Sequence, residues 1–459
     1  MTADAAPMVP TRPRTFFGEP WPILYLAFTE AWERFSFYGM SALLVLYMSQ
    51  TLLLPGHAEH IAGFGAFRSG LEAVFGPMST IALASQIYGL YSGFVYFTPV
   101  LGGLVADHWL GRRHAVMLGA VLMSAGHLAM AFDASFLLAL GLLIVGCGLL
   151  KGNISAQVGG LYRADDSVGR TRGFAIFSIG INVGAVAGPL ACGLLAQIWG
   201  WHVGFALAGV LMLMGLATYM LGYRHLPPDR GATRTATVHP PLTGAQWRVV
   251  FALMAVMALT ICQSIAYYQN TNINLIWINQ HVDLNFLGFH VPVAWFNSID
   301  SAVSIAFVPI LFALWRRQAA GRGEPGEIGK IATGAWIAAA ANLLLVLSCL
   351  AGPRSPAIVP ITYDVLLGVA FLYYWPTLLA LVSRMAAPRV NSTLMGVVFL
   401  SLFISNNLVG WLGQFYERMG PTAFWTLHTA IAAAGGVLAL VLMRPLERIL
   451  NTSGSAPPP

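Results

Sequence analysis

Long apolar segments alternate with short polar segments along nearly the whole chain. About 20 apolar residues form a helix that crosses a hydrocarbon layer of about 30 Å. The widest interruption, rich in proline, threonine and arginine, covers residues 224–245, with six long apolar segments on each side. The pattern therefore predicts twelve membrane-spanning helices, at residues 23–52, 78–106, 114–132, 136–162, 173–198, 203–223, 246–280, 292–315, 328–352, 357–386, 391–416 and 421–443.

Two sets of six predicted helices indicate an all-α membrane protein made of two bundles. Paired six-helix halves around a central site recur in transporters. We expect the linker to be too short for a further helical hairpin. The predicted parts are a cytoplasmic tail at 1–22, bundles at 23–223 and 246–445, a cytoplasmic linker at 224–245, and a disordered tail at 446–459.

The composition agrees with this prediction and adds an orientation. The chain is 57% hydrophobic and 9% charged, whereas a soluble domain has roughly 25% charged residues. The net charge of +6 does not indicate nucleic acid, because most basic residues gather in loops predicted on one side of the membrane. Only Arg68, Arg354 and Arg418 lie in loops predicted on the other side. Cytoplasmic loops carry such an excess, so both termini are predicted to be cytoplasmic.

The first predicted helix contains the stretch EAWERFSFYGM, which carries three ionisable residues. Positions i, i+3 and i+4 share a helix face, so Glu30, Glu33 and Arg34 are expected to point together. A charge at mid-membrane costs about 2.5–3.5 kcal/mol and normally faces a wet interior. Arg34 neutralises one carboxylate, and burial favours the uncharged form of the other. The cluster predicts a proton-loading group; the alternative is an ion pair that only holds the helix in place.

A second intramembrane charge is Lys151, in the fourth predicted helix. No acidic residue lies in the same helix. Because a lone ammonium in an apolar environment needs a negative partner, we expect that partner to be a carboxylate of another helix or of a substrate.

These residues lie in motifs that resemble a known family. EAWERFSFYG resembles the ExxERFxYYG signature of the proton-dependent oligopeptide transporter (POT) family, a branch of the major facilitator superfamily. GCGLLKGNIS, FSIGINVGAVAGP, WFNSIDS and SRMAAPRVNSTLMG resemble further motifs of the same family. The resemblance implies the major facilitator fold and proton-coupled peptide transport.

The resemblance also implies roles for individual residues. Glu30, Glu33 and Arg34 would couple proton movement to transport, together with Lys151, which would also receive the peptide carboxylate. The expected substrate-binding residues are Tyr38, Tyr96, Lys151, Asn182, Tyr268 and Asp300.

Several positions depart from the family pattern. Ser41 and Tyr268 replace both members of a charged gating pair, so closure of the outer side is expected to use other contacts. Leu372 removes the usual anchor for the peptide amino group, and Asp300 is a candidate replacement that pairs with Lys151 when no substrate is bound. The alternative is that Asp300 is only hydrogen-bonded within its own helix pair. The remaining departures are Phe37 and Val398.

These observations predict a proton-coupled symporter of di- and tripeptides in the bacterial inner membrane. We expect protons as the coupling ion, no cofactor, no metal, contacts with lipid and small peptides, and a monomer. Two alternatives stay open: a proton-coupled carrier of another small solute, such as a modified peptide, nitrate or a metabolite, and a receptor that binds peptide without transporting it. No nucleophile and base occur at a recognisable spacing, so an enzyme is not expected.

Overall fold

The computed structural model describes residues 15–16, 18–163, 166–226, 241–321 and 323–454. Most of the predicted linker and of the predicted N-terminal tail lies outside these residues. The predicted disordered tail at 446–459 is wrong over its described part, because the last helix continues to Gly454. We call α1–α7 the N-terminal half and α8–α15 the C-terminal half. The N-terminal half contains α1 (Pro22–Tyr47), α2 (Phe64–Phe75), α3 (Thr80–Val105), α4 (Arg112–Ala129), α5 (Phe136–Gly160), α6 (Ser167–Trp199) and α7 (Trp201–Gly222).

The C-terminal half is also helical, and strands are confined to two small hairpins. The hairpins pair β1 (Thr15–Phe16) with β2 (Glu19–Pro20) and β3 (Asn285–Phe286) with β4 (Phe289–His290). The helices are α8 (Gly244–Tyr268), α9 (Ile273–His281), α10 (Asn297–Ala320), α11 (Glu327–Ala351), α12 (Ile358–Met385), α13 (Asn391–Gly413), α14 (Tyr416–Met419) and α15 (Pro421–Gly454).

The expected all-helical membrane chain is confirmed. In the described part of the chain, ten helical segments are long and apolar enough to cross a membrane; they contain α3, α5–α8, α10–α13 and α15. The two other predicted spans correspond to α1, which carries Glu30, Glu33 and Arg34, and to α4, which begins with Arg112 and Arg113.

Two local features differ from the sequence prediction. The predicted span 246–280 is broken, because α8 ends at Tyr268, a short turn follows at Gln269–Thr271, and α9 begins at Ile273. The predicted outer loop before the second span contains α2, a 12-residue helix. Both misses concern helix continuity, which average hydropathy does not report.

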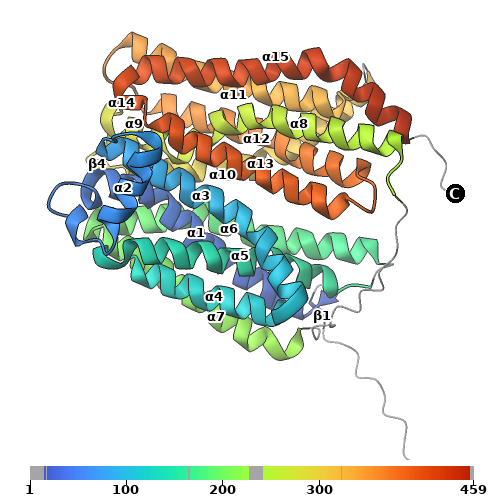
Figure 1. Cartoon of the computed structure of the whole chain (residues 1–459), viewed down its shortest axis with the longest axis horizontal. Coiled ribbons are helices and arrows are strands. Elements are labelled where there is room, and N and C mark those ends of the chain that lie inside the picture. The colour runs from blue at the N-terminus through green and yellow to red at the C-terminus, as the bar shows by residue number, and fades with distance from the viewer. Residues whose placement is uncertain (1–14, 17, 164–165, 227–240, 322, 455–459) are drawn as a thin grey trace, which may run out of the picture.

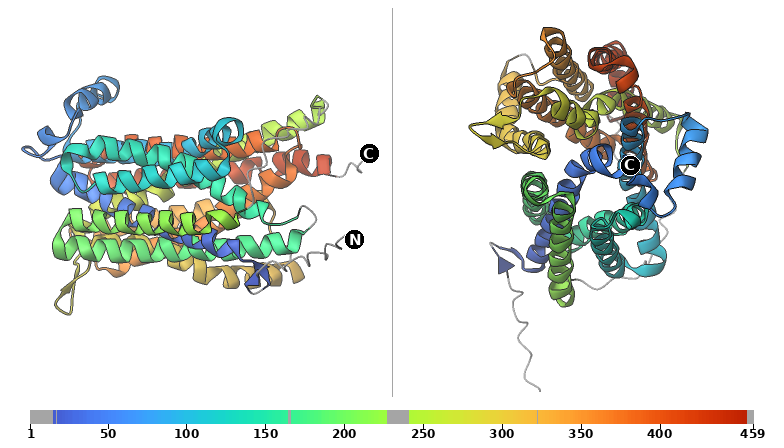
Figure 2. Two further views of the ribbon diagram at one scale, coloured as in Figure 1. Left: turned by 90° about the horizontal axis from the view of Figure 1, so that it is seen from below. Right: turned by 90° about the vertical axis from the view of Figure 1, so that its left-hand side faces the viewer.

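The long helices run side by side along the longest axis of the molecule (Figure 1). β1 and the last turn of α15 lie at one end, whereas α2, α9 and α14 lie at the opposite end (Figures 1 and 2). We call this second end the outer end.

The contacts that join the two halves include several near the outer end. Asn272 donates a hydrogen bond to Ser85 Oγ over 2.7 Å, and Ser85 Oγ donates to the Gly410 carbonyl over 3.2 Å. A Cβ atom at Gly89 would lie 2.6 Å from the carbonyl oxygen of Asn406, so α3 and α13 touch backbone to backbone. Trp295 Nε1 donates to the Leu190 carbonyl over 2.9 Å. Two further contacts there use charged side chains, because Ser79 donates to the Glu417 carboxylate and Arg418 donates to the Pro77 carbonyl over 3.3 Å. These contacts close the outer end without the charged pair that Ser41 and Tyr268 replace.

Small residues also permit close packing within the N-terminal half. A Cβ atom at Gly102 of α3 would overlap the carbonyl group of Gly148 in α5, whereas a Cβ atom at Gly103 would meet no atom within 4 Å. Such small residues let membrane helices approach each other.

We therefore predict that Gly102→Ala lowers the thermal stability of the purified protein and that Gly103→Ala does not. Overpacking a tight contact typically costs about 1–3 kcal/mol, and here the contacted atoms are backbone, which does not move aside. Thermal unfolding in one detergent measures both variants. Equal melting temperatures for the two variants would contradict this contact.

Candidate functional site

The ionisable cluster of α1 is buried and compact. Arg34 Nε donates to Glu30 Oε1 over 2.7 Å and lies 2.9 Å from Glu33 Oε2. The exposed fractions of Glu30, Glu33 and Arg34 are 2%, 0% and 3%. Neither carboxylate oxygen of Glu33 has a hydrogen-bond partner among the described residues. The structure thus brings the three residues together, with one cation between two acids.

Helix α6 holds this cluster in place through a row of glycines four residues apart. Residues four apart share one face of a helix, and at each glycine the backbone of α1 occupies the space of a side chain. A Cβ atom at Gly180, Gly184 or Gly188 would lie 2.5–2.6 Å from the carbonyl oxygen of Ala27, Ala31 or Phe35, respectively.

Lys151 of α5 lies against aromatic rings rather than against an acid. Its Nζ atom is 4.8 Å from the ring centre of Tyr96 and 5.7 Å from that of Phe37. Among the described residues it has no carboxylate within ion-pair distance. Cation–π contacts stabilise a desolvated cation, and they leave the Lys151 amino group without an acidic partner in the described part.

The predicted tyrosines lie around Lys151 and link the two halves. Tyr268 of α8 donates from its hydroxyl to the hydroxyl of Tyr96 in α3 over 3.4 Å, with ring centres 5.9 Å apart. Tyr38 packs edge-on against Phe37, with ring centres 5.2 Å apart. Because Tyr96 also contacts Lys151, its hydrogen bond with Tyr268 brings a residue of the C-terminal half close to Lys151.

Asn182 forms no hydrogen bond with these tyrosines or with Lys151. It is half-buried on α6 and makes no hydrogen bond within the described part of the chain. It lies two residues before Gly184, and residues two apart do not share a helix face.

Asp300 of α10 is buried in the C-terminal half, with 8% of its surface exposed. Its Oδ2 atom accepts a hydrogen bond from the Tyr267 hydroxyl over 2.6 Å, and its Oδ1 atom accepts one from Ser301 over 3.3 Å. The expected pairing with Lys151 in the absence of substrate is wrong, because the Tyr267 hydroxyl takes that place. A phenol stabilises a buried carboxylate without neutralising it.

Sequence reasoning missed two residues near Asp300. Tyr267 precedes Tyr268 in the chain, and nothing in the apolar pattern indicates that it would bond to Asp300. Asp364 of α12 is absent from the predicted site residues, yet it is 1% exposed. The departures Leu372 and Val398 are buried in apolar clusters, so they offer no polar group at those positions.

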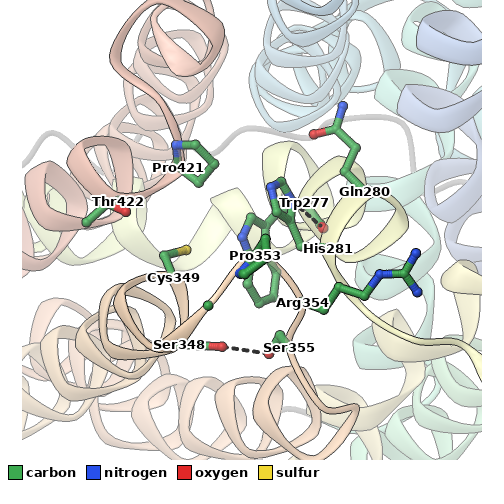
Figure 3. Close-up of a pocket in the computed structure, with 11 residues that line it drawn as sticks. Trp277, Gln280, His281, Ser348, Cys349, Pro353, Arg354, Ser355, Pro421 and Thr422 are labelled. Atoms are coloured by element: carbon green, nitrogen blue, oxygen red, sulfur yellow. Dashed lines mark hydrogen bonds between the residues drawn. The ribbon is translucent and has the colours of Figure 1, made fainter.

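A cavity in the C-terminal half lies apart from these residues. A cavity of about 450 Å³ at the outer end is lined by α9, by the loop between α11 and α12, and by the start of α15. Figure 3 shows Trp277 stacked on His281 there, with Arg354 extending away from Cys349. It contains none of the predicted site residues. The described residues hold no group of three or more His, Cys, Asp or Glu suited to a metal ion.

The sequence of this chain is similar to those of known transporters. The family model described as the POT family matches residues 113–239 and 242–425. The chain is 29% identical to the peptide transporter YePEPT of Yersinia enterocolitica, over 96% of this chain and 97% of that protein. It is 26% identical to a di-/tripeptide transporter of Lactococcus lactis subsp. cremoris, over 95% of this chain and 98% of that protein.

A solved structure agrees over the same range. The crystal structure of the peptide transporter POT in complex with sulfate has a TM-score of 0.82 and 25% sequence identity, covering 95% of this chain and 97% of that chain.

We predict that Arg34→Met destabilises the protein by about 3–5 kcal/mol, because it leaves two buried carboxylates without a cation. The matched control is Arg68→Met in α2. Arg68 also pairs with a glutamate four residues away, Glu72, over 2.9 Å, but both side chains are partly exposed. Exposed pairs contribute about 0–1 kcal/mol. Thermal unfolding compares the two, and a loss for Arg34→Met no larger than for Arg68→Met would contradict the buried cluster.

Proposed function

Because the chain belongs to the POT family, we propose that it carries di- and tripeptides together with protons across the bacterial inner membrane by alternating access. The observation that carries the proposal is the pairing of a buried acid–base cluster, Glu30, Glu33 and Arg34, with a nearby ammonium, Lys151, that has no acidic partner in the described part. The first can load a proton, and the second can hold a carboxylate.

The proposal includes a topology of twelve spans. Helices α1 and α4 are the two spans whose charges reduce their hydropathy, and the bundles cover residues 23–223 and 246–445. β1 and the last turn of α15 lie at the same end (Figure 1), which supports cytoplasmic placement of both termini. The linker at 224–245 joins the bundles on that side.

Proton coupling is assigned to the cluster and to Lys151. Two carboxylates and one guanidinium leave one negative charge in excess (−2 + 1 = −1). In a poorly hydrated site this excess is removed most readily by a proton. Glu33 is the best candidate, because it is fully buried and both its oxygens lack hydrogen bonds.

The proposed substrate is a zwitterion held at both ends. Lys151 receives the carboxylate with help from the hydroxyls of Tyr38, Tyr96 and Tyr268, and Asp300 receives the ammonium. Asn182 is proposed to bind a polar group of the peptide once the substrate is present. We propose protons as the coupling ion, no further cofactor, and a monomer as the functional unit.

A second candidate is a proton-coupled carrier of another small solute with an amine and a carboxylate. It is favoured by the apolar environment of Leu372 and Val398. A receptor without transport is a weaker candidate, since it has no use for a proton-loading cluster.

We predict that Glu33→Gln abolishes gradient-driven accumulation of labelled dialanine in proteoliposomes. Peptide exchange at equal pH stays within about threefold of wild type, because exchange moves no net proton. Uptake under an imposed inward proton gradient measures accumulation, and counterflow at equal pH measures exchange. The control is Glu72→Gln, which removes an exposed carboxyl group. Accumulation by Glu33→Gln at the wild-type level would refute the assignment.

We predict that Asp300→Asn weakens dialanine binding about 10- to 100-fold, because a charged hydrogen bond contributes about 1.5–3 kcal/mol. Binding of N-acetylated dialanine, which has no ammonium, stays unchanged. Lys151→Gln should weaken the binding of dialanine to a similar extent. It should leave the binding of dialanine amide, which has no carboxylate, unchanged. Competition against labelled dialanine measures all three ligands, with Asp283→Asn in the exposed outer hairpin region as control. If Asp300→Asn leaves dialanine affinity unchanged, Asp300 is not the ammonium site.

A further inference from the structure

The C-terminal half contains a second buried carboxyl group to which the proposed function gives no role. Asp364 of α12 is 1% exposed, and its Oδ2 atom has no hydrogen-bond partner in the described part. It lies one helical turn before Gly368, on the same face of α12. A Cβ atom at Gly368 would be 2.7 Å from the carbonyl oxygen of Asp300, so this face packs directly on α10. Asp364 therefore lies one helical turn from the point where α12 meets the backbone of Asp300.

Among the described residues, no basic side chain forms an ion pair with Asp300 or Asp364. Helices α8, α10, α11 and α13 and the turn Val293–Phe296 pack against α12. Helix α13 and the turn have no titratable residue, and the groups near the pair are Asp300, its donor Tyr267, and Tyr363 on α12 itself. Tyr268 and Tyr374 pack on Tyr267, with ring centres 5.1 and 6.4 Å from its own, and Tyr38 of α1 also lies within electrostatic reach of Asp300. These three groups are phenols and bring no positive charge. The other titratable residues of these helices are Arg248, Cys262, Arg316, Arg317, Glu327, Lys330, Cys349, Tyr373 and Arg384. Sixteen helical residues separate Asp300 from Arg316, about 24 Å.

A neighbouring amide and a neighbouring phenol each carry a buried oxygen atom without a partner among the described residues. Asn270 is 2% exposed, its side chain faces Asp300, and its Oδ1 atom accepts no hydrogen bond. The Tyr363 hydroxyl is fully buried and unpartnered among the described residues. Asp364 Oδ2 therefore remains a buried acceptor without a donor in the described part. A proton on one carboxyl group converts an acceptor into a donor and removes one of two like charges.

We propose that Asp364 and Asp300 form a second proton site, which holds one proton while the outer end is closed. Asp364 lies on the outer side of Asp300, and opening of the outer end hydrates it. Closure then removes water from two adjacent carboxylates, and uptake of a proton from outside offsets that cost. Asp300, which faces the proposed substrate site, gives the proton its exit. The inference rests on proton-coupled transport and adds one proton to each cycle.

The test is the proton-to-dialanine ratio, obtained from reversal potentials in proteoliposomes. Asp364→Asn, which is permanently neutral, should lower the ratio by one and remove one titration step from the pH profile of uptake. Peptide counterflow should stay within about twofold of wild type. Asp364→Glu should restore the wild-type ratio, and Asp283→Asn, the same change at an exposed outer position, should leave it unchanged.

Several outcomes overturn the proposal. A wild-type ratio and pH profile in Asp364→Asn would show a purely structural carboxyl group; Asp364→Ser, a smaller neutral variant, decides the point if Asp364→Asn does not fold. Loss of uptake when choline replaces Na⁺ would make the site a metal-cation site. Absence of proton-driven uptake by the wild type would overturn the proposed function as well. Failure of the second site alone would leave wild-type uptake proton-driven and the ratio of Asp364→Asn unchanged, so the two failures are distinguishable.

Discussion

The cost of removing charge from water governs the arrangement of this protein's interior. A carboxylate or an ammonium in an apolar environment persists only with a partner or a proton. The structure meets this constraint in three ways. Arg34 is shared by Glu30 and Glu33, Lys151 lies against the rings of Phe37 and Tyr96, and Asp300 accepts a hydrogen bond from Tyr267. None of these solutions provides full neutralisation, and this shortfall is what gives the interior an affinity for protons and zwitterions.

Close helix packing makes these arrangements rigid. The glycines of α6 bring its backbone against α1, so the cluster is held by main-chain contacts as well as by its own ion pairs. The same device at Gly89 brings α3 of one half against α13 of the other. Glycine thus serves both the fixed packing within a half and the contact that separates when the halves move.

Much of this could be predicted from the sequence, because membrane insertion imposes a strong one-dimensional pattern. Apolar length predicted the spans, and helical spacing predicted that Glu30, Glu33 and Arg34 share a face. The break between α8 and α9 was missed, because the run around it is apolar enough on average to predict one continuous span. The polar residues Asn270 and Asn272 at the break did not change that average enough to interrupt the predicted span. The burial of Asp364 and the partner of Asp300 were also missed. Both depend on which helix packs beside α12 or α10, and hydropathy carries no information about partners.

Each ion pair described here joins two residues of the same half, and the contact beside Lys151 that crosses between the halves is a bond between two neutral phenols, Tyr96 and Tyr268. A rocking motion of one half against the other therefore breaks no ion pair beside Lys151, but it changes the distance between Lys151 and Asp300, which lie in opposite halves. The electrical signal of a transport cycle would then combine the carried charges with the displacement of these two side chains.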